Sequence, residues 1–582
     1  MSLNPFKKIN FISILLLIFI AIFLGMSMNP VSAATINVSS GLQNYDIQTL
    51  IDGAQAGDTI NFAGNSYSNV SLIINKKLNI ISLINTVISS NDSTGINGSS
   101  MGITETFAFY FTRNSSGSVI SGFNILTNSD YGIIAENVKN ITISSNNISG
   151  GYKGSIKLNN VSNTTVSKNK LSNSKGNGLT IQSSKKISIT GNQISNNTYS
   201  GIKVYKSNDI NITKNKDLNN NLSGISIYSS KNISVKNNTI QKNGHGVYLS
   251  NTNKVNVSNN EINKNILNGI SLEDKTENTY ISYNTITGNL NGIYVDSYSV
   301  NDTLLSNIIA NSTKNPHNYL GKYNDGNGIA IGDNYQESNS KINIKYNVII
   351  DNGRFAIKSN PNLGHDLQVG ANWYGTNNYD NTGICPMVGT CMLLAKLEKT
   401  SNGYALRFYD SSTGAAVTDL PVFNATFLLN NANPQIVSVI DGTAFYNYNL
   451  SKLENNLITA IVGKETLNLV LPPSSTPSTP TTPTNNTHKT NPNSNTSGIG
   501  SSNGNGTGSG NGSFSGSGVG LDSIGPIGTT SGGGSSGGGQ NPVEVSVKNT
   551  INSIKDNPYT SLAVLALIAL VAVGYFRRDK SN

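Results

Sequence analysis

Apolar and polar residues alternate along much of this chain, in short runs that return at a nearly constant interval. The phrase Gly-Ile-x-Ile, or a close variant, opens many of these runs, with steps of 22 or 23 residues until a last step of 36. Its first position is occupied by Gly132, Ser155, Gly178, Gly201, Gly224, Gly246, Gly269, Gly292 and Gly328. Alternation with a period of two predicts strands that bury one face.

A column of asparagines keeps the same interval in a second register. Each follows a short apolar run, at steps of 22 to 24 residues and a final step of 40. The column consists of Asn146, Asn169, Asn192, Asn215, Asn238, Asn260, Asn284, Asn307 and Asn347. In stacked coils these residues would lie about 4.8 Å apart. We therefore expect a buried ladder that satisfies turn amides, while the glycine column suits either a positive φ or a tight corner.

Each unit of about 23 residues carries three short apolar runs separated by turns. It is too short for a helix-containing repeat of the ankyrin type, and it lacks a leucine framework. We therefore predict an all-β fold whose body, residues 35–376, is a right-handed parallel β-helix. Phe123 takes the asparagine place one coil upstream, and residues 46–55 are expected to form an amphipathic helix that caps the N-terminal edge.

The pattern changes after the β-helix. Strand-like runs between Leu393 and Val462 predict a small Ig-like β-sandwich over residues 377–472. Residues 473–541 are rich first in Thr, Pro and Ser and then in Gly and Ser, which predicts a disordered linker. Residues 542–558 form a juxtamembrane segment.

Both ends of the chain carry export signals. Residues 1–34 have the basic start, apolar run and small residues of a signal peptide. Residues 559–576 form an apolar stretch that predicts a transmembrane helix, and the basic tail, residues 577–582, places the body outside the cell. Residues 557–561 resemble a sortase signal, so covalent sorting is the alternative to a retained membrane anchor.

Composition narrows the partners. The net charge is +9, but charged residues make up 12% and form no dense basic run, so no nucleic-acid partner is expected. Cys385 and Cys391 are expected to form a disulfide loop, with no metal site between them. Sequons that are candidates for glycosylation include Asn140, Asn211, Asn232, Asn256 and Asn301.

Residues 36–376 resemble the NosD-type family of right-handed parallel β-helix repeats, and particularly the adhesin-like surface proteins of methanogenic archaea. The resemblance rests on the Gly-Ile-x-Ile phrase, the asparagine column and the closing run Ala371-Asn372-Trp373-Tyr374-Gly375. It implies a β-helix displayed at the cell surface. It does not specify an activity, because this fold serves lyases, hydrolases, epimerases and binding proteins.

Candidate chemistry lies in the columns that stacking would create. Four residues after the glycine column come Glu136, Asn159, Gln182, Tyr205, Tyr228, Ser250, Glu273 and Asp296. An acidic patch would lie beside a platform of Tyr205 and Tyr228. The patch would be formed by Glu273, Asp274, Asp296 and Asp333. Glu273, Asp296 and Asp333 are the candidates for glycoside hydrolysis, and carboxylates on adjacent coils could also bind Ca²⁺. The alternative is that these are ordinary polar residues near strand ends.

Two further features bear on ligand binding. The long loop at residues 311–326 could line the site with His317, Tyr319, Tyr323 and Asp325. Gly244-His245-Gly246 matches part of a polygalacturonase motif, but its aspartates and following Arg-x-Lys are missing, so His245 is expected to be a turn residue.

These features favour an exported, non-catalytic, adhesin-like protein without a cofactor, which binds a glycan, a neighbouring cell or the envelope through its β-helix. A surface carbohydrate-active enzyme and a structural envelope component are the alternatives.

Overall fold

A computed structural model describes residues 32–90, 92–95, 98–296, 298–313, 326–332, 341–359, 367–379, 391–447 and 456–470. All of these fall within one compact unit, Met1–Thr479. The predicted linker, juxtamembrane segment, membrane span and basic tail lie outside the described residues, as does nearly all of the predicted signal peptide. Within the described ranges, no helix is both long and apolar enough to cross a bilayer.

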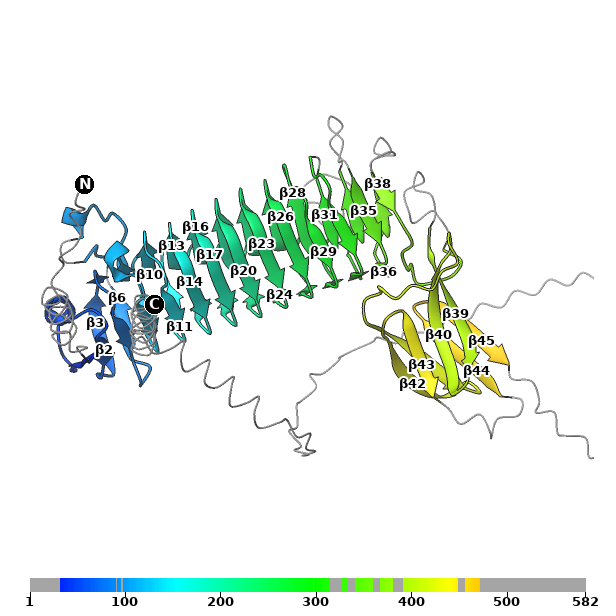
Figure 1. Ribbon diagram of the computed structural model, residues 1–582, viewed down its shortest axis with the longest axis horizontal. Coiled ribbons are helices and arrows are strands. Elements are labelled where there is room, and N and C mark those ends of the chain that lie inside the picture. Colours follow the sequence, from blue (N-terminus) through cyan, green and yellow to red (C-terminus); the bar gives the residue numbers. More distant parts are fainter. Residues whose placement is uncertain are drawn as a thin grey trace, which may run out of the picture. The chain divides into compact units, whose positions relative to one another are not determined.

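The body of the chain is a parallel β-helix whose full coils each contribute one strand to sheets A, B and C (Figure 1). Over the described residues these sheets have 14, 12 and 12 strands. Neighbouring strands pair in parallel, so that in sheet C Ile202 lies opposite Ile225, which lies opposite Val247. The predicted three-strand coil of about 23 residues is therefore confirmed.

The strand bounds follow the order of each sheet. Sheet A contains β1 (Thr35–Val38), β2 (Thr59–Phe62), β5 (Asn79–Ile81), β8 (Val119–Ser121), β11 (Thr142–Ser144), β14 (Ser162–Ser167), β17 (Lys185–Thr190), β20 (Asn208–Thr213), β23 (Lys231–Lys236), β26 (Asn253–Ser258), β29 (Tyr280–Ser282), β32 (Thr303–Leu305), β35 (Ile342–Lys345) and β38 (Leu367–Val369). Sheet B contains β3 (Ser66–Val70), β6 (Val87–Ser90), β9 (Asn124–Thr127), β12 (Asn147–Gly150), β15 (Lys170–Ser172), β18 (Gln193–Ser195), β21 (Lys216–Leu218), β24 (Thr239–Gln241), β27 (Glu261–Asn263), β30 (Thr285–Thr287), β33 (Ile308–Ala310) and β36 (Val348–Ile350). Sheet C contains β4 (Leu72–Ile74), β7 (Phe107–Phe111), β10 (Tyr131–Glu136), β13 (Gly154–Asn159), β16 (Asn177–Gln182), β19 (Ile202–Tyr205), β22 (Ser223–Tyr228), β25 (His245–Ser250), β28 (Ile270–Glu273), β31 (Ile293–Val295), β34 (Ile329–Ile331) and β37 (Ile357–Lys358).

Columns of inward isoleucine, valine and leucine fill the coils and form one buried cluster along the β-helix. Ile202, Ile225 and Val247 are fully buried members. Burying such a side chain stabilises the fold by about 1.5–3 kcal/mol. Because each coil contacts mainly its neighbours, the repetition of these columns provides most of the stability.

The asparagine column forms a buried hydrogen-bonded ladder. The Nδ2 of Asn215 donates to the Oδ1 of Asn238 at 3.1 Å and to the carbonyl oxygen of Ile189 at 2.9 Å. The ladder extends to Asn372, whose Oδ1 accepts from the backbone N–H and the Nδ2 of Asn347. The closing run of the β-helix thus contributes a further rung.

A second asparagine ladder was not expected from the sequence. The Nδ2 of each member except the last, Asn289, donates to the Oδ1 of the member one coil later, at 2.9 to 3.2 Å. Its members are Asn197, Asn220, Asn243, Asn265 and Asn289. They lie at the turn between sheets B and C, so this corner is also held by buried amide groups.

The glycine column allows sheet C to pack closely against sheet B and against the next coil. None of its described members has a positive φ, so that part of the sequence interpretation was wrong. At Gly224, a Cβ atom would lie 2.3 Å from the Cγ2 of Ile240 and 3.0 Å from the carbonyl oxygen of Gly246. The strand therefore passes too close to the sheet B isoleucine and to the next coil for any side chain.

Replacing Gly224 by alanine is expected to lower the free energy of unfolding by about 2–3 kcal/mol, because the added methyl group overpacks the corner. Urea unfolding checks the change. Gly53 is the matched control, since a Cβ atom there has nothing within 4 Å. Equal stability of the two variants would contradict the packing explanation.

A helix covers the N-terminal end of the β-helix. It is α2 (Asn44–Gly53), and its Ile47 and Ile51 are fully buried. The side-chain amide of Gln48 donates to the carbonyl oxygen of Ile73 and accepts from its backbone N–H, at 3.0 and 2.9 Å. This pairing satisfies β4, the first strand of sheet C, where no earlier strand is paired. The described short 3₁₀ segments are η1 (Ser99–Met101) and η2 (Arg113–Ser115).

Two small antiparallel sheets follow the β-helix. One contains β39 (Leu393–Thr400), β40 (Gly403–Asp410) and β43 (Thr443–Asn447), and the other contains β42 (Ala432–Val439), β41 (Phe423–Leu429), β44 (Leu457–Val462) and β45 (Glu465–Val470). β45 was not expected from the sequence. Trp373 is fully buried with its ring 5.0 Å from that of Phe408, so the last described coil shares a core with these sheets. The Ig-like assignment stays a prediction.

Candidate functional site

The outer face of sheet C carries two parallel files of side chains, two residues apart along each strand. The inner file is Tyr110, Ile134, Lys157, Thr180, Lys203, Ser226, Tyr248, Ser271 and Tyr294. The outer file is Glu136, Asn159, Gln182, Tyr205, Tyr228, Ser250 and Glu273. Residues two apart on a strand project from the same face, so the two files share the outer face of the sheet, although Ile134, Ser226 and Ser271 are fully buried among their neighbours.

Tyr205 and Tyr228 are brought together on adjacent strands of this surface. The Nζ of Lys206 lies 5.0 Å from the centre of the Tyr205 ring, and the Nζ of Lys203 lies 5.6 Å from that of Tyr228. Such cation–π contacts orient the rings at a modest energetic gain. The platform expected from the sequence is therefore bordered by two ammonium groups.

Tyr248 connects this platform to the acidic residues. Its ring lies 5.4 Å from that of Tyr228, and its hydroxyl donates to the Oε2 of Glu273 at 2.9 Å. Burial raises the pKa of Tyr248, and the Glu273 carboxylate raises it further. Tyr248 is thus a neutral hydrogen-bond donor. Tyr248 belongs to the inner file, two residues before the column of residues from which the sequence predicted a site, so the sequence did not predict it.

The carboxylates of Glu273 and Asp274 are held by hydroxyl groups. Ser271 Oγ donates to the Oε1 of Glu273 at 2.8 Å, and Ser250 Oγ donates to the Oδ2 of Asp274. Asp274 has a φ of +54°, so it lies in the turn that follows the strand. The two carboxylates are therefore fixed in place at the edge of the tyrosine platform.

Asp296 lies one coil beyond Glu273. Its backbone N–H donates to the carbonyl oxygen of Leu272 at 2.8 Å, and its Oδ1 accepts from Tyr294 at 3.4 Å. Asp333, His317, Tyr319, Tyr323 and Asp325 lie outside the described residues. The structure thus places part of the predicted acidic patch.

His245 is the first residue of β25 rather than a turn residue, which corrects the sequence-based expectation. Its ring lies 5.4 Å from that of Tyr248, on the outer face of sheet C. Burial lowers the pKa of His245 to about 4, so the imidazole is neutral at pH 7. The strand extends this far because Ser223 and His245 pair in register.

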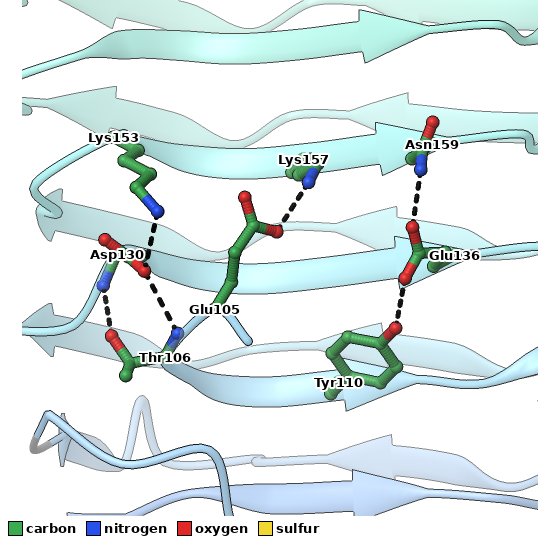
Figure 2. Close-up of polar contacts among 8 residues, drawn as sticks. All are labelled: Glu105, Thr106, Tyr110, Asp130, Glu136, Lys153, Lys157 and Asn159. Carbon is green, nitrogen blue, oxygen red and sulfur yellow. Dashed lines mark hydrogen bonds and ion pairs between the residues drawn. The ribbon is translucent and has the colours of Figure 1, made fainter. Parts of the chain in front are cut away.

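A second polar cluster lies at the N-terminal end of the same face (Figure 2). Glu136 accepts hydrogen bonds from Tyr110 and Asn159, while Lys157 forms an ion pair with Glu105. The two carboxylates project from separate parts of the chain toward partners on neighbouring strands (Figure 2). Burial raises the pKa of Tyr110, and so does its hydrogen bond to Glu136.

Further polar contacts lie beside this N-terminal cluster and hold it in place. Lys153 forms an ion pair with Asp130 at 3.1 Å, and the backbone N–H of Asp130 donates to the Oγ1 of Thr106 at 2.8 Å (Figure 2). Beneath these groups, Tyr110 and Tyr131 belong to a small buried apolar cluster. Because these side chains are occupied with one another, they act as a structural brace at this end of the face.

The structure bears on the metal site and the disulfide only within the residues that it describes. Among the residues that the structure describes, no group of three or more His, Cys, Asp or Glu side chains is placed to hold a metal ion. Within the same residues Cys391 has no disulfide partner, and Cys385 lies outside them. The disulfide stays a prediction.

A family model described as a right-handed beta helix region matches residues 131–281 and 223–391. No curated protein matches the sequence. Among solved structures, the chain is similar to the A-module of mannuronan C-5 epimerase AlgE6 from Azotobacter vinelandii, with 16% identity, 57% of this chain and 94% of that chain covered, and a TM-score of 0.41. It is also similar to tailspike protein 2 of bacteriophage CBA120, with 11% identity, 77% of each chain covered and a TM-score of 0.40. An exopolygalacturonase from Thermotoga maritima has 10% identity, 48% and 87% covered, and a TM-score of 0.35.

Likenesses at this level of identity and TM-score carry no inference about substrate. The family match and the three stacked parallel sheets agree on the architecture. This chain is a parallel β-helix protein.

Proposed function

We propose that this chain is an exported, membrane-anchored, adhesin-like surface protein that binds an extended glycan along the outer face of sheet C, without turnover. The predicted signal peptide and the apolar segment 559–576 support export and anchoring. The NosD-type resemblance supports the same placement. The glycan belongs to a neighbouring cell or to the envelope.

The observation that carries the proposal is the tract formed by Tyr205, Tyr228 and Tyr248, which ends at Glu273. Aromatic rings offer apolar faces for the C–H groups of sugar rings, and their polar tips bind hydroxyl groups. The carboxylate and the neighbouring serines add acceptors and donors whose positions are already fixed. A few polar groups among aromatic rings are typical of sites that bind small molecules and sugars.

Binding without turnover fits the state of the carboxylates. Glycoside hydrolysis uses an acid and a base or nucleophile on opposite sides of the scissile bond. Both carboxyl oxygens of Glu273 instead accept hydrogen bonds, from Tyr248 and Ser271, which hold the side chain in place. The enzyme alternative rests on Glu273, Asp296 and Asp333, of which Glu273 and Asp296 lie on adjacent coils and Asp333 lies outside the described residues.

Replacing Tyr228 by alanine is expected to weaken glycan binding about tenfold, which corresponds to about 1.4 kcal/mol. The ring is the centre of the tract, so its loss removes the stacking surface and the contact with Tyr248. The measurement is a binding isotherm of the purified chain on a ligand identified with a glycan array.

Tyr280 provides the matched control, because it is an exposed tyrosine on sheet A. Its alanine variant should bind like the wild type. Release of reducing or unsaturated ends that disappears in the Glu273→Gln/Asp296→Asn variant would establish the enzyme instead. Absence of any glycan binding would favour the structural envelope role.

A further inference from the structure

A cavity of about 390 Å³ lies at the corner where sheet C turns into sheet A, beside the tyrosine tract. It spans the coils that contain β19, β22 and β25 and reaches the following coil. Lys206, Lys231 and Lys275 line it together with serine, threonine and asparagine side chains. Lys206 also contacts the Tyr205 ring, so the cavity is continuous with the proposed glycan-binding face.

The lining of this cavity is electropositive. Three ammonium groups face one carboxylate, Glu277, which gives the wall a net charge of +2 (three lysines minus one glutamate). Glu277 Oε2 already accepts a hydrogen bond from Asn253 Nδ2 at 2.7 Å. Within the described residues, none of these three lysines forms an ion pair with a carboxylate. Like charges held on adjacent coils repel one another, and an anion between them relieves that repulsion.

The backbone explains why the ammonium groups gather here. Asn208, Lys231 and Asn253 lie in one register across sheet A, and Glu277 continues it through an isolated bridge. Lys206 has a φ of +47° at the preceding turn, so its side chain projects from the corner rather than from the sheet. The coil stacking thus brings residues more than 60 positions apart to one cavity.

Three buried hydroxyl groups on successive coils line the cavity, those of Ser207, Ser230 and Thr252, and the last of them differs in its hydrogen bonding. Ser207 Oγ and Ser230 Oγ donate to carbonyl oxygens at 2.9 and 2.7 Å, and each accepts a backbone N–H from the preceding coil. Thr252 takes the next position and is 2% exposed, yet its hydroxyl has no hydrogen-bond partner within the described residues. Thr252 lines the cavity, but its hydroxyl is buried, so the donors that an occupant can reach are the exposed lysine ammonium groups and the hydroxyl of Ser229.

We propose that this cavity is a subsite for the anionic substituent, a carboxylate or a sulfate ester, of an acidic polysaccharide whose backbone lies on the tyrosine tract. This inference rests on the proposed glycan binding and names its substrate class. Ammonium groups and hydroxyl donors are the groups that bind oxyanions, and the adjoining tyrosines bind the uncharged sugar faces.

The test compares binding of the full chain to polygalacturonate, chondroitin sulfate and the neutral polysaccharide dextran, at low and at high salt. We expect at least tenfold tighter binding to one of the acidic polysaccharides, lost progressively as salt is added. The Lys206→Ala/Lys231→Ala/Lys275→Ala variant should lose at least tenfold of this affinity, and a larger factor than it loses for neutral glycans, because only Lys206 among the three also contacts the Tyr205 ring. A preference for the carboxylated or for the sulfated polymer identifies the substituent.

Two variants keep the test independent of net charge and of folding. Lys170→Ala/Lys216→Ala/Lys242→Ala removes the same charge from exposed positions in and after sheet B strands, and it should change affinity less than twofold. Glu277→Gln removes the one carboxylate of the cavity and should tighten acidic-glycan binding severalfold.

Equal losses in the two lysine variants, or an unchanged affinity in Glu277→Gln, would overturn the subsite. Neutral glycans that bind through Tyr228 without any preference for acidic polymers would overturn the subsite alone and leave the proposed function standing. Failure of every glycan to bind would overturn both.

Discussion

Replacing Asn215 by leucine is expected to lower the free energy of unfolding by about 3–5 kcal/mol. Asn215 is 2% exposed and sits within the long asparagine ladder. Its Oδ1 accepts from the backbone N–H and the Nδ2 of Asn192, both at 2.9 Å, and its Nδ2 donates to the carbonyl oxygen of Ile189. Leucine removes these three hydrogen bonds. The Nδ2 of Asn192 keeps the carbonyl oxygen of Val166, but the backbone N–H of Asn192 loses its side-chain acceptor, and an unsatisfied buried group costs about 1–3 kcal/mol. Urea unfolding measures the loss.

The control for this variant is Asn211→Leu, which changes an exposed asparagine on the outer face of sheet A. It should alter stability by less than about 0.5 kcal/mol. A loss at Asn215 that is no larger than the loss at Asn211 would show that the ladder fills space without holding the coils together.

Replacing Asp217 by isoleucine is expected to raise the free energy of unfolding by about 2–4 kcal/mol at pH 7. Asp217 is fully buried in sheet B, in register between Ile194 and Ile240, and neither carboxylate oxygen has a hydrogen-bond partner within the described residues. Isoleucine fits because Ile194 and Ile240 already pack their Cγ2 atoms over Gly178 and Gly224. Asp217 occupies the same place over Gly201.

The effect of Asp217 depends on pH in a defined direction. Burial raises the pKa of Asp217 well above its ordinary value. A carboxyl group whose pKa is raised by folding favours the folded state below its unfolded pKa of about 3.9, and this contribution falls as the pH rises through the folded pKa. The gain in Asp217→Ile should therefore be smaller at pH 4 than at pH 7.

Asp217→Asn separates titration from packing, since it stays polar but carries no charge. Burial also raises the pKa of Asp302, to about 7, so the wild-type curve contains both groups and the Asp217 contribution is the difference between variants. A stability gain that is the same at pH 4 and pH 7 would contradict the assignment of a buried, titrating carboxyl group.

The fold was predictable because two columns keep one interval. The spacing of Asn146 to Asn347 and of Gly132 to Gly328 sets the coil length, and the alternation of isoleucines sets which face is buried. The second ladder, Asn197 to Asn289, has the same interval but lies in a sequence rich in asparagine, where one more column does not stand out. The glycine column shows a further limit, since spacing alone did not separate a positive φ from close packing.

The candidate site was only partly predictable. Tyr205, Tyr228 and Glu273 were found because each lies four residues after a member of the glycine column. Tyr248 lies two residues earlier on its strand, so reading a single column left it out. Glu105 lies before β7, where the regular interval has not yet begun, so its pairing with Lys157 could not be derived from spacing.

The central claim is that glycan lies along the outer face of sheet C, and a structure of the chain with its array-identified glycan tests it most directly. The account predicts sugar rings on Tyr205 and Tyr228, with hydroxyl groups near Glu273. A glycan bound on sheet A, on sheet B or on the antiparallel sheets, with the tyrosine tract empty, would contradict it.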